Sequence, residues 1–245
     1  MLVRSLVATA VCTASLPCAA LLIRADRDDA EYLELATRYA SSVRLPASAG
    51  EGVLVGARWV LTAAAPATLL KELHPTPAIS IAGREYDIDS IHTDGTLALL
   101  YLSKPVRGVE PIRVHRGVDE PGKILAVVGH GPTGKLGGSA AGPSDGKRRA
   151  GINTIDVVSE KTFTVRIRGG DDASDLQGAL SPGEIGAGAY LGDDDGDLYV
   201  AGIAVSTLAG KETFVRTSRH FKWIEDTMLE AATREAEKLL GSGLE

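Results

Sequence analysis

The side chains able to act as a general base are few and scattered. The chain has 5 histidines. They are His74, His92, His115, His130 and His220. A serine nucleophile needs an imidazole within hydrogen-bond reach, yet no histidine shares a local motif with a serine. No two histidines stand at the spacing of zinc ligands. We therefore expect no metal site and no cofactor.

Two further polar residues have both a catalytic and a structural interpretation. Ser181 lies in a glycine-rich segment and could be a displaced nucleophile, with one of the first three histidines as its base. His130 stands in the mostly apolar run 123–131, where a packing role is the simpler interpretation. No motif joins a serine to a histidine, so we expect both residues to be structural.

The N-terminus has the pattern of an export signal. Arg4 supplies a positive charge, residues 5–23 are almost wholly apolar or small, and Cys18-Ala19-Ala20 suits a cleavage site. An uncleaved membrane anchor is one alternative. A lipoprotein signal ending at Cys18 is another, although Pro17 fits it poorly. The prediction is a signal peptide or N-terminal anchor at 1–23, with the remainder exported, periplasmic or secreted.

Both cysteines, Cys12 and Cys18, lie inside this predicted signal. A mature chain without them has no disulfide, no cysteine nucleophile and no thiolate metal site. The net charge is -6, which argues against nonspecific nucleic-acid binding. We expect an unidentified protein or peptide partner, no nucleic acid, and a membrane only if the N-terminal segment is retained.

Two acidic loops invite comparison with cation sites. The loop at 169–177 carries three aspartates, and residues 193–197 form an acidic tip that contains the hairpin signal Asp195-Gly196. Neither spacing is that of an EF-hand. We expect solvated loops, although the hairpin tip could hold a cation weakly.

Short apolar runs separated by turns predict a chain built mainly of strands. Val53-Leu54-Val55 and Trp59-Val60-Leu61 flank a tight turn, residues 78–102 contain three strands, and 149–158 and 162–167 are two more. The C-terminus differs, because apolar residues follow helical spacing there up to Leu240.

Several of these segments together resemble trypsin-like serine proteases. The run 50–66, G-E-G-V-L-V-G-A-R-W-V-L-T-A-A-A-P, is similar to the family's strand pair ending in T-A-A-H-C. T-L-A-L-L-Y-L at 96–102 resembles D-I-A-L-L, and 183–188 with the later V-A-G-I resembles the nucleophile segment G-D-S-G-G-P. Residues 217–224 resemble the entry to the family's terminal helix.

This resemblance implies an all-β fold, the two-barrel trypsin-like fold with a C-terminal α-helix. The implied domain runs over 24–241, with a first barrel at about 45–115 and a second at about 120–210. The C-terminal helix is expected at about 217–240.

The resemblance also implies that the family's catalytic groups are missing. The histidine position is Ala65, the aspartate position is Thr96 and the serine position is Ile185. Asp94 is close to Thr96, but Asp94-Gly95 is more simply the turn before a strand. Alanine cannot take a proton, isoleucine cannot attack a carbonyl and threonine has no carboxylate to orient a histidine, so the catalytic set is degenerate.

Other site positions follow from the same alignment. The backbone N–H groups of Gly183 and Ile185 would form the oxyanion-hole-like pair, and Ala179 is the pocket-base position. Glu184 replaces an aspartate that pairs with a new N-terminal amine in activated members, and no activation sequence precedes Arg24.

The resulting functional hypothesis is an inactive trypsin-like homologue, a pseudoprotease, with a binding or regulatory role. One alternative is a serine endopeptidase or other hydrolase that uses relocated residues. Another is a structural module that assembles through its C-terminal helix.

Overall fold

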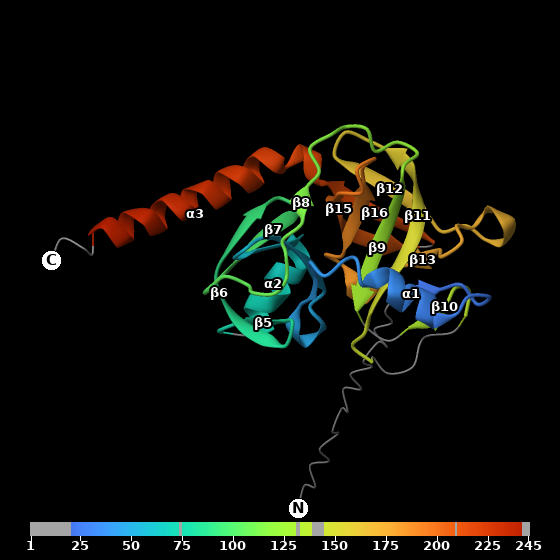
Figure 1. Ribbon diagram of the computed structural model, residues 1–245, viewed down its shortest axis with the longest axis horizontal. Helices are drawn as coiled ribbons and strands as arrows, with labels where there is room; N and C mark the ends of the chain where they lie inside the picture. Colours follow the sequence, from blue (N-terminus) through green and yellow to red (C-terminus); the bar gives the residue numbers. More distant parts are fainter. Residues whose placement is uncertain (1–20, 74, 131–132, 139–144, 209, 242–245) are drawn as a thin grey trace, which may run out of the picture.

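The apolar strands close into two six-stranded barrels that lie side by side (Figure 1). The computed structural model describes residues 21–73, 75–130, 133–138, 145–208 and 210–241. Residues 1–20 of the predicted signal fall outside this description. The predicted all-β, two-barrel class is confirmed by the strand content and topology.

The first barrel has the strand order β2-β3-β4-β7-β6-β5. Its strands are β2 (Ser42–Arg44), β3 (Glu51–Gly56), β4 (Trp59–Ala63), β5 (Ala78–Ile81), β6 (Arg84–Asp94) and β7 (Leu97–Leu102). Antiparallel pairing sets Trp59 opposite Tyr101 and Ala63 opposite Leu97. The three strands predicted within 78–102 are thus present, and Asp94 ends β6 at the tight turn into β7.

A helix that the sequence reasoning missed follows β4 without a break. It is α2 (Ala64–Leu73), and it buries Pro66, Ala67 and Leu70. Proline is well tolerated in the first turn of a helix, where its missing N–H has no intrahelical partner to lose.

The second barrel has the order β14-β9-β11-β12-β16-β15, and a β14–β15 pairing closes it. Its strands are β9 (Ile124–His130), β11 (Arg148–Val158), β12 (Thr162–Arg166), β14 (Gly188–Gly192), β15 (Leu198–Leu208) and β16 (Lys211–Arg216). The segment between the barrels adds the short β8 (Arg113–Val114) parallel to β15. This barrel carries the turn at 181–188, where the sequence placed the degenerate serine position.

The N-terminal segment packs on the second barrel. β1 (Leu22–Ile23) pairs with both β10 (Gly134–Lys135) and β13 (Gly178–Ala179). α1 (Asp29–Ala36) follows, and the Asp28 carboxylate caps it by accepting from the Ala30 N–H at 3.2 Å. The ordered structure therefore includes residues that the sequence assigned to the signal.

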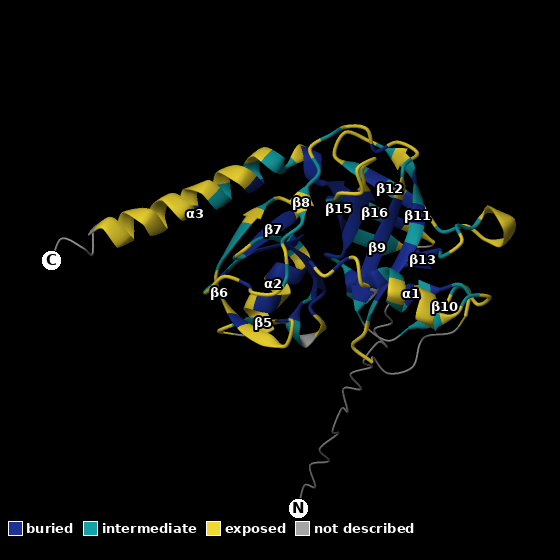
Figure 2. Cartoon of the chain, in the orientation of Figure 1, coloured by how far each residue is buried: buried dark blue, intermediate teal, exposed yellow. Residues whose placement is uncertain are grey.

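One apolar core joins the two barrels. Val53, Leu61 and Leu99 from the first barrel and Val128 and Ile203 from the second belong to the same buried cluster. Figure 2 shows buried residues, in dark blue, along strands of both barrels. The two barrels are therefore in contact through packed side chains.

The C-terminal helix α3 (Phe221–Gly241) runs outward from the barrels, and its far half is largely exposed (Figures 1 and 2). Ile224 and Ala231 are buried, whereas Leu239 and Leu240 are exposed. Among the described residues, no helix has the length and apolar character needed to span a bilayer.

Candidate functional site

The three positions aligned with a catalytic set lie around Gly50, where the two barrels touch. The Ala64 N–H donates to the Thr96 carbonyl at 2.8 Å, so Ala65 and Thr96 stand on adjoining backbone. A Cβ at Gly50 would lie 2.9 Å from the Pro66 side chain and 2.4 Å from the Ile185 carbonyl oxygen. Because the Pro66 side chain and the Ile185 carbonyl both lie close to Gly50, the segments that contain Ala65 and Ile185 are near each other.

No reactive side chain occupies these positions. Ala65 and Thr96 are exposed, and Ile185 is half-buried against the core shared by the barrels. Of the three, only Thr96 has a polar side-chain atom, and its hydroxyl cannot orient an imidazole as a carboxylate does.

The turn at 181–188 is held by backbone contacts to both barrels. The Ile185 carbonyl accepts from the Glu51 N–H at 2.9 Å, and the Gly186 N–H donates to the Ala204 carbonyl at 2.8 Å. Gly186 has φ +93°, and a Cβ there would lie 2.1 Å from the Glu51 carbonyl oxygen. Gly183, half-buried, lies in the 3-10 turn Pro182–Glu184, next to Ile185. Gly183 and Ile185, the residues predicted to form the oxyanion-hole-like pair, are thus two positions apart on a turn that backbone hydrogen bonds fix.

Three buried glutamates lie in or next to this turn. The sequence alone did not predict that they form a cluster. Glu51 is 1% exposed, Glu184 is 1% exposed and Glu212 is 2% exposed. Burial raises the pKa of Glu51 and of Glu184 well above the usual range, and the Glu51 charge adds to the rise at Glu184. Burial, helped by Glu184, raises the pKa of Glu212 to about 8.

His130 packs as the sequence predicted, but it also has a carboxyl partner. Its Nδ1 lies 2.8 Å from Glu51 Oε2, and its backbone N–H donates to Glu51 Oε1 at 3.1 Å. Burial lowers the pKa of His130 to about 3. With the Glu51 pKa raised, both shifts favour a neutral pair in which the Glu51 carboxyl donates to the imidazole.

A hollow of about 680 Å³ lies next to Glu212 of the glutamate cluster. Ala179, the predicted pocket-base residue, lines it together with Leu180 and Thr207. Glu212 also lines it, with Oε1 accepting from the Leu180 N–H and Oε2 buried without a partner among the described residues. The hollow combines an apolar wall with charged residues of both signs, which are Arg168, Lys211 and Glu212.

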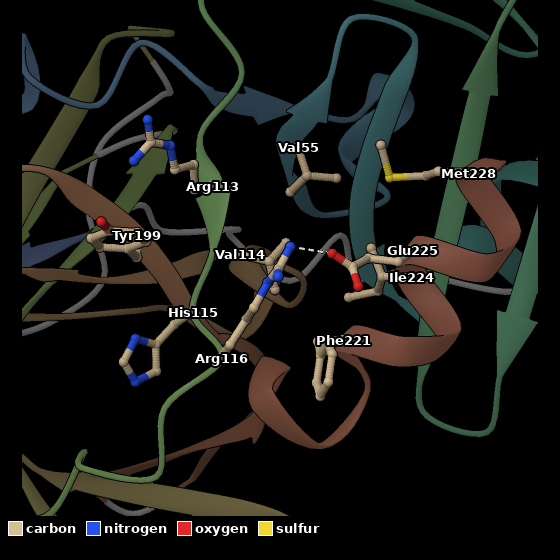
Figure 3. A pocket seen from close by; sticks show the side chains of 10 residues that line it. All are labelled: Val55, Arg113, Val114, His115, Arg116, Tyr199, Phe221, Ile224, Glu225 and Met228. Atoms are coloured by element: carbon tan, nitrogen blue, oxygen red, sulfur yellow. Dashed lines mark hydrogen bonds and ion pairs between the residues drawn. The ribbon is translucent and has the colours of Figure 1, made fainter. Parts of the chain in front are cut away.

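A second groove, of about 400 Å³, lies where the segment between the barrels meets the start of α3 (Figure 3). Val114, Ile224 and Met228 give it an apolar floor. Arg116 lies across its mouth and is paired with Glu225. None of the three degenerate positions lines this groove.

The histidines are distributed over separate sites. His220 Nδ1 lies 2.8 Å from Asp94 Oδ2, so this histidine is paired, and its side chain is only 16% exposed. His115 faces Asp119. His92 Nε2 lies 3.0 Å from Ser90 Oγ. His74 falls outside the described residues.

Ser181 is 1% exposed, and its backbone N–H donates to Glu184 Oε2 at 2.8 Å.

In the acidic hairpin tip, the Asp193 carboxylate accepts from the N–H groups of Asp195 and Asp197. It therefore shapes the turn. Within the described parts of the chain, no group of three or more His, Cys, Asp or Glu is arranged to hold a metal ion.

No known protein family matches the chain, and no curated protein is similar to it in sequence. Similar folds exist among solved structures. Human heparin binding protein gives a TM-score of 0.56 at 16% identity, covering 78% of this chain and 92% of its own. A double mutant of that protein gives 0.58 at 17% identity, covering 79% and 93%. Another mutant gives 0.56 at 17% identity, covering 83% and 94%. At such identities the likeness concerns the fold alone, which is the chymotrypsin-like two-barrel fold.

Proposed function

We propose that this chain, a chymotrypsin-like two-barrel domain, is an exported protease homologue without catalytic activity whose role is to bind a protein or peptide. The observation that carries the proposal is the replacement of all three reactive positions where the barrels meet. Ala65, Thr96 and Ile185 supply neither a base, nor a carboxylate, nor a nucleophile. Acyl transfer on this scaffold needs all three groups, because they act as a unit.

The surroundings of these positions support a structural role for the remaining polar groups. Glu51 is engaged by His130, and Glu184 accepts from the Ser181 backbone N–H. Both of these carboxyls are fully buried, so neither can contact a peptide on the surface of the domain. Backbone N–H groups alone would leave only residual catalysis, several orders of magnitude below an active enzyme.

The hollow beside Ala179 is the binding site that we propose for a partner's side chain. Its wall of Ala179 and Leu180 suits an aliphatic group. Heparin, which the name of a structural neighbour mentions, is a poor candidate here. A net charge of -6 opposes the binding of a polyanion.

Inactivity is tested by treating the exported, purified protein with a fluorophosphonate probe and by a casein digestion assay. We expect no labelled serine and no digestion, with active trypsin as the positive control. Stoichiometric labelling of any serine would overturn the proposal. Binding is tested separately by recovering bound peptides from a random library and comparing the parent with Thr207→Trp, which fills the hollow. Ser206→Trp is the matched control, since Ser206 lines a different hollow.

A hydrolase with relocated residues is the second candidate, and one contact favours it. Ser90 and His92 are within hydrogen-bond distance because residues two apart on a strand face the same side. Among the described residues, however, no carboxylate is hydrogen-bonded to the His92 ring. The ring packs against Trp59, with centroids 5.7 Å apart. Burial lowers the pKa of His92, which leaves it neutral but unoriented.

The probe experiment also separates these two candidates. If Ser90 were a nucleophile, labelling would occur and Ser90→Ala would abolish it. The exposed Ser80 on neighbouring β5 offers a matched Ser80→Ala control. We expect no labelling of the parent, which would leave both variants without effect.

A further inference from the structure

The groove between the barrel-connecting segment and α3 is built from three parts of the fold (Figure 3). Val55 comes from the end of β3, Val114 from β8, and Ile224 and Met228 from the first half of α3. We call the hollow above these four side chains the linker groove. Its volume of about 400 Å³ is at the lower end of the range for small-molecule sites, about 300 to 1,000 Å³. It is thus large enough for the apolar part of one small ligand.

The floor of the linker groove is fixed by packing. A Cβ at Gly56 would lie 2.6 Å from Met228 Cε, so the glycine leaves the space that the methionine occupies. Ile224 is 1% exposed and belongs to the core shared by the barrels, and Val55, Val114 and Met228 pack against that core. A preformed floor of this kind costs a ligand little reorganisation.

The backbone of the connecting segment is already bonded to both barrels. The His115 N–H donates to the Val200 carbonyl of the second barrel at 2.9 Å. The Ile112 N–H donates to the Leu54 carbonyl of the first barrel at 2.9 Å. An extended peptide that adds to a sheet uses free backbone groups of an edge strand. The linker groove therefore suits a small ligand that contacts side chains better than it suits such a peptide.

The rim of the linker groove is positively charged. Arg113 and Arg116 line it, and Glu225 is the one acidic residue among the described residues that do so. This local excess of positive charge contrasts with the net charge of -6 for the whole chain. A cationic rim above an apolar floor attracts a ligand that has an anionic head and a hydrocarbon body.

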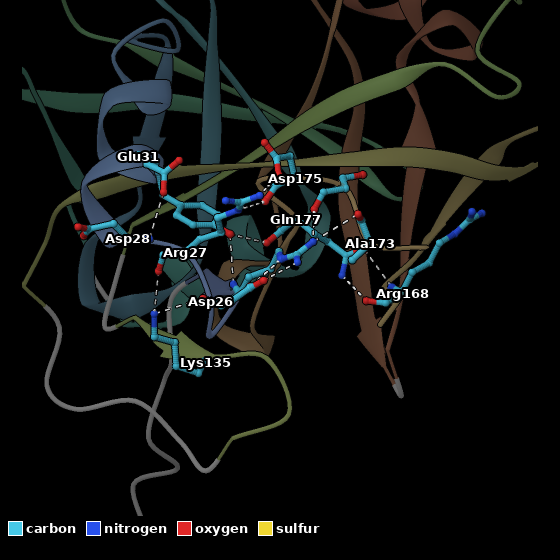
Figure 4. A network of polar contacts seen from close by, with 12 residues as sticks. Asp26, Arg27, Asp28, Glu31, Lys135, Arg168, Ala173, Asp175 and Gln177 are labelled. Atoms are coloured by element: carbon cyan, nitrogen blue, oxygen red, sulfur yellow. Dashed lines mark hydrogen bonds and ion pairs between the residues drawn. The ribbon is translucent and has the colours of Figure 1, made fainter. Parts of the chain in front are cut away.

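Both arginines have hydrogen-bond donors to offer a ligand. Other cationic side chains serve the fold, and Figure 4 shows Lys135, whose Nζ donates to the Arg24 and Arg27 carbonyls at 3.2 and 3.3 Å and so fixes the lead-in to α1. Arg113 and Arg116, by contrast, are 73% and 65% exposed and form one ion pair each within the described residues. A guanidinium has several N–H donors, and an exposed ion pair contributes little to stability. A ligand carboxylate therefore replaces such a partner at small cost.

We propose that the linker groove binds an aliphatic carboxylate of medium chain length, such as octanoate. The hydrocarbon chain lies on the floor of Val114, Ile224 and Met228. Figure 3 shows Arg116 reaching across the groove beside Val114 to its partner Glu225. The ligand carboxylate takes the place of Glu225 on this guanidinium, whose planar fork fits a carboxylate with two parallel hydrogen bonds.

The first test is isothermal titration of the whole protein at pH 7 with octanoate, octylammonium and acetate. We expect octanoate to bind one-to-one with a Kd on the order of 1 mM or below. Octylammonium should bind at least about 10-fold more weakly, because the rim opposes its charge. Acetate, which lacks the chain, should show no saturable binding. Each CH₂ added between hexanoate and octanoate should tighten binding about 4-fold.

Two results of this titration would overturn the proposal. One is the absence of saturable octanoate binding below about 10 mM. The other is equal binding of octanoate and octylammonium, because a groove that ignores the charge of the head group does not use its arginines.

Two substitutions with opposite effects locate the ligand. Arg116→Gln should weaken octanoate binding about 10-fold. Glu225→Gln should tighten it about 3-fold, because Arg116 loses its competing carboxylate. Arg107→Gln is the charge-matched control, since Arg107 is exposed and does not line the groove. If Arg116→Gln and Glu225→Gln changed the Kd in the same direction, or not at all, the ligand would not contact Arg116 and the proposal would be wrong.

Filling the groove is a test that leaves the charges unchanged. Val55→Phe should weaken octanoate binding at least about 10-fold, whereas Val118→Phe is the matched control, because Val118 is 63% exposed and lines a different hollow. Thr207→Trp should also leave octanoate binding unchanged, so the failure of this site and the failure of the proposed function are distinguishable. Melting temperatures check folding, and the surface variant Glu225→Gln decides if Val55→Phe does not fold. Loss of binding in Thr207→Trp alone would place the ligand in the hollow beside Ala179 and refute the proposal.

Discussion

The carbonyl of Ile185 accepts a hydrogen bond from the N–H of Glu51 at 2.9 Å, and this contact ties the turn of the second barrel to the first strand after Gly50. The Ile185 side chain differs from the serine expected at an active centre, yet its backbone contact with Glu51 links the two barrels. Binding surfaces at this junction therefore depend on the turn at 181–188 keeping its shape.

Gly186 should be the most sensitive glycine of this turn. Gly186→Ala adds a methyl group 2.1 Å from the Glu51 carbonyl oxygen at φ +93°. We expect a loss of at least about 3 kcal/mol in the free energy of unfolding, measured by urea denaturation. Gly196→Ala is the control, because Gly196 has φ +86° with no atom within 4 Å. It should cost only about 1 to 2 kcal/mol. Equal losses would mean that contact with Glu51 is unimportant.

The pH dependence of stability should change when Glu212 is replaced. Burial raises the folded-state pKa of Glu212 to about 8 from its ordinary value of 4.5. The folded state therefore holds a proton that the unfolded state has lost, and stability falls as pH rises from about 4.5 to 8. Glu212→Gln keeps the oxygen that accepts from Leu180 and removes the charge. Relative to the parent it should gain stability on the order of a few kcal/mol at pH 8 and almost nothing at pH 4. Urea denaturation of both proteins at pH 4 and pH 8 measures the effect. If the free energies of unfolding of Glu212→Gln and the parent differed by the same amount at both pH values, the prediction would be wrong.

Rebuilding the missing groups tests the alignment of the site. The triple variant Ala65→His, Thr96→Asp, Ile185→Ser should acquire slow labelling by a fluorophosphonate probe. Each single substitution should remain unlabelled, because the three groups act as a unit. Circular dichroism and the melting temperature control for folding. A folded triple variant without labelling would show that the three positions do not converge well enough for catalysis.

The limits of the sequence reasoning follow from the kind of contact involved. Local apolar patterns predicted β7 (Leu97–Leu102) and the strand around Val165, because alternation and turns are encoded within a few residues. The pairing of His130 with Glu51 joins residues far apart in sequence, and a glutamate beside two glycines carries no local sign of burial. α2 was missed because the alanine-rich run at its start, which contains Pro66, was interpreted as the exit from a strand rather than as the first turn of a helix.

The buried ion pair of Arg216 and Glu120 should be worth more than any surface pair. Arg216 Nε and Nη2 donate to the two Glu120 carboxylate oxygens at 2.9 and 2.7 Å, and Glu120 is 0% exposed. Glu120→Ala leaves a buried guanidinium without its carboxylate and should cost about 3 to 5 kcal/mol. Asp197→Ala, which breaks the exposed pair with Arg113, should cost at most about 1 kcal/mol. Denaturant unfolding of the two variants measures the contrast, and similar values would remove the buried pair as a major source of stability.

The outer half of α3 should be dispensable for the stability of the barrels. Glu235 anchors the helix to the first barrel, since its carboxylate accepts from Arg58 Nη1 at 2.5 Å and from the Tyr101 hydroxyl at 3.1 Å. Leu239 and Leu240 beyond it are 71% and 74% exposed. Removing residues 237–245 should therefore change the free energy of unfolding by less than about 1 kcal/mol, whereas Glu235→Ala in the full chain tests the anchor alone. Light scattering on the full and shortened chains then separates stability from assembly. We expect both chains to have the same molar mass in solution. If only the full chain formed a larger assembly, the helix would have an oligomerisation role in place of the binding role proposed for the barrels.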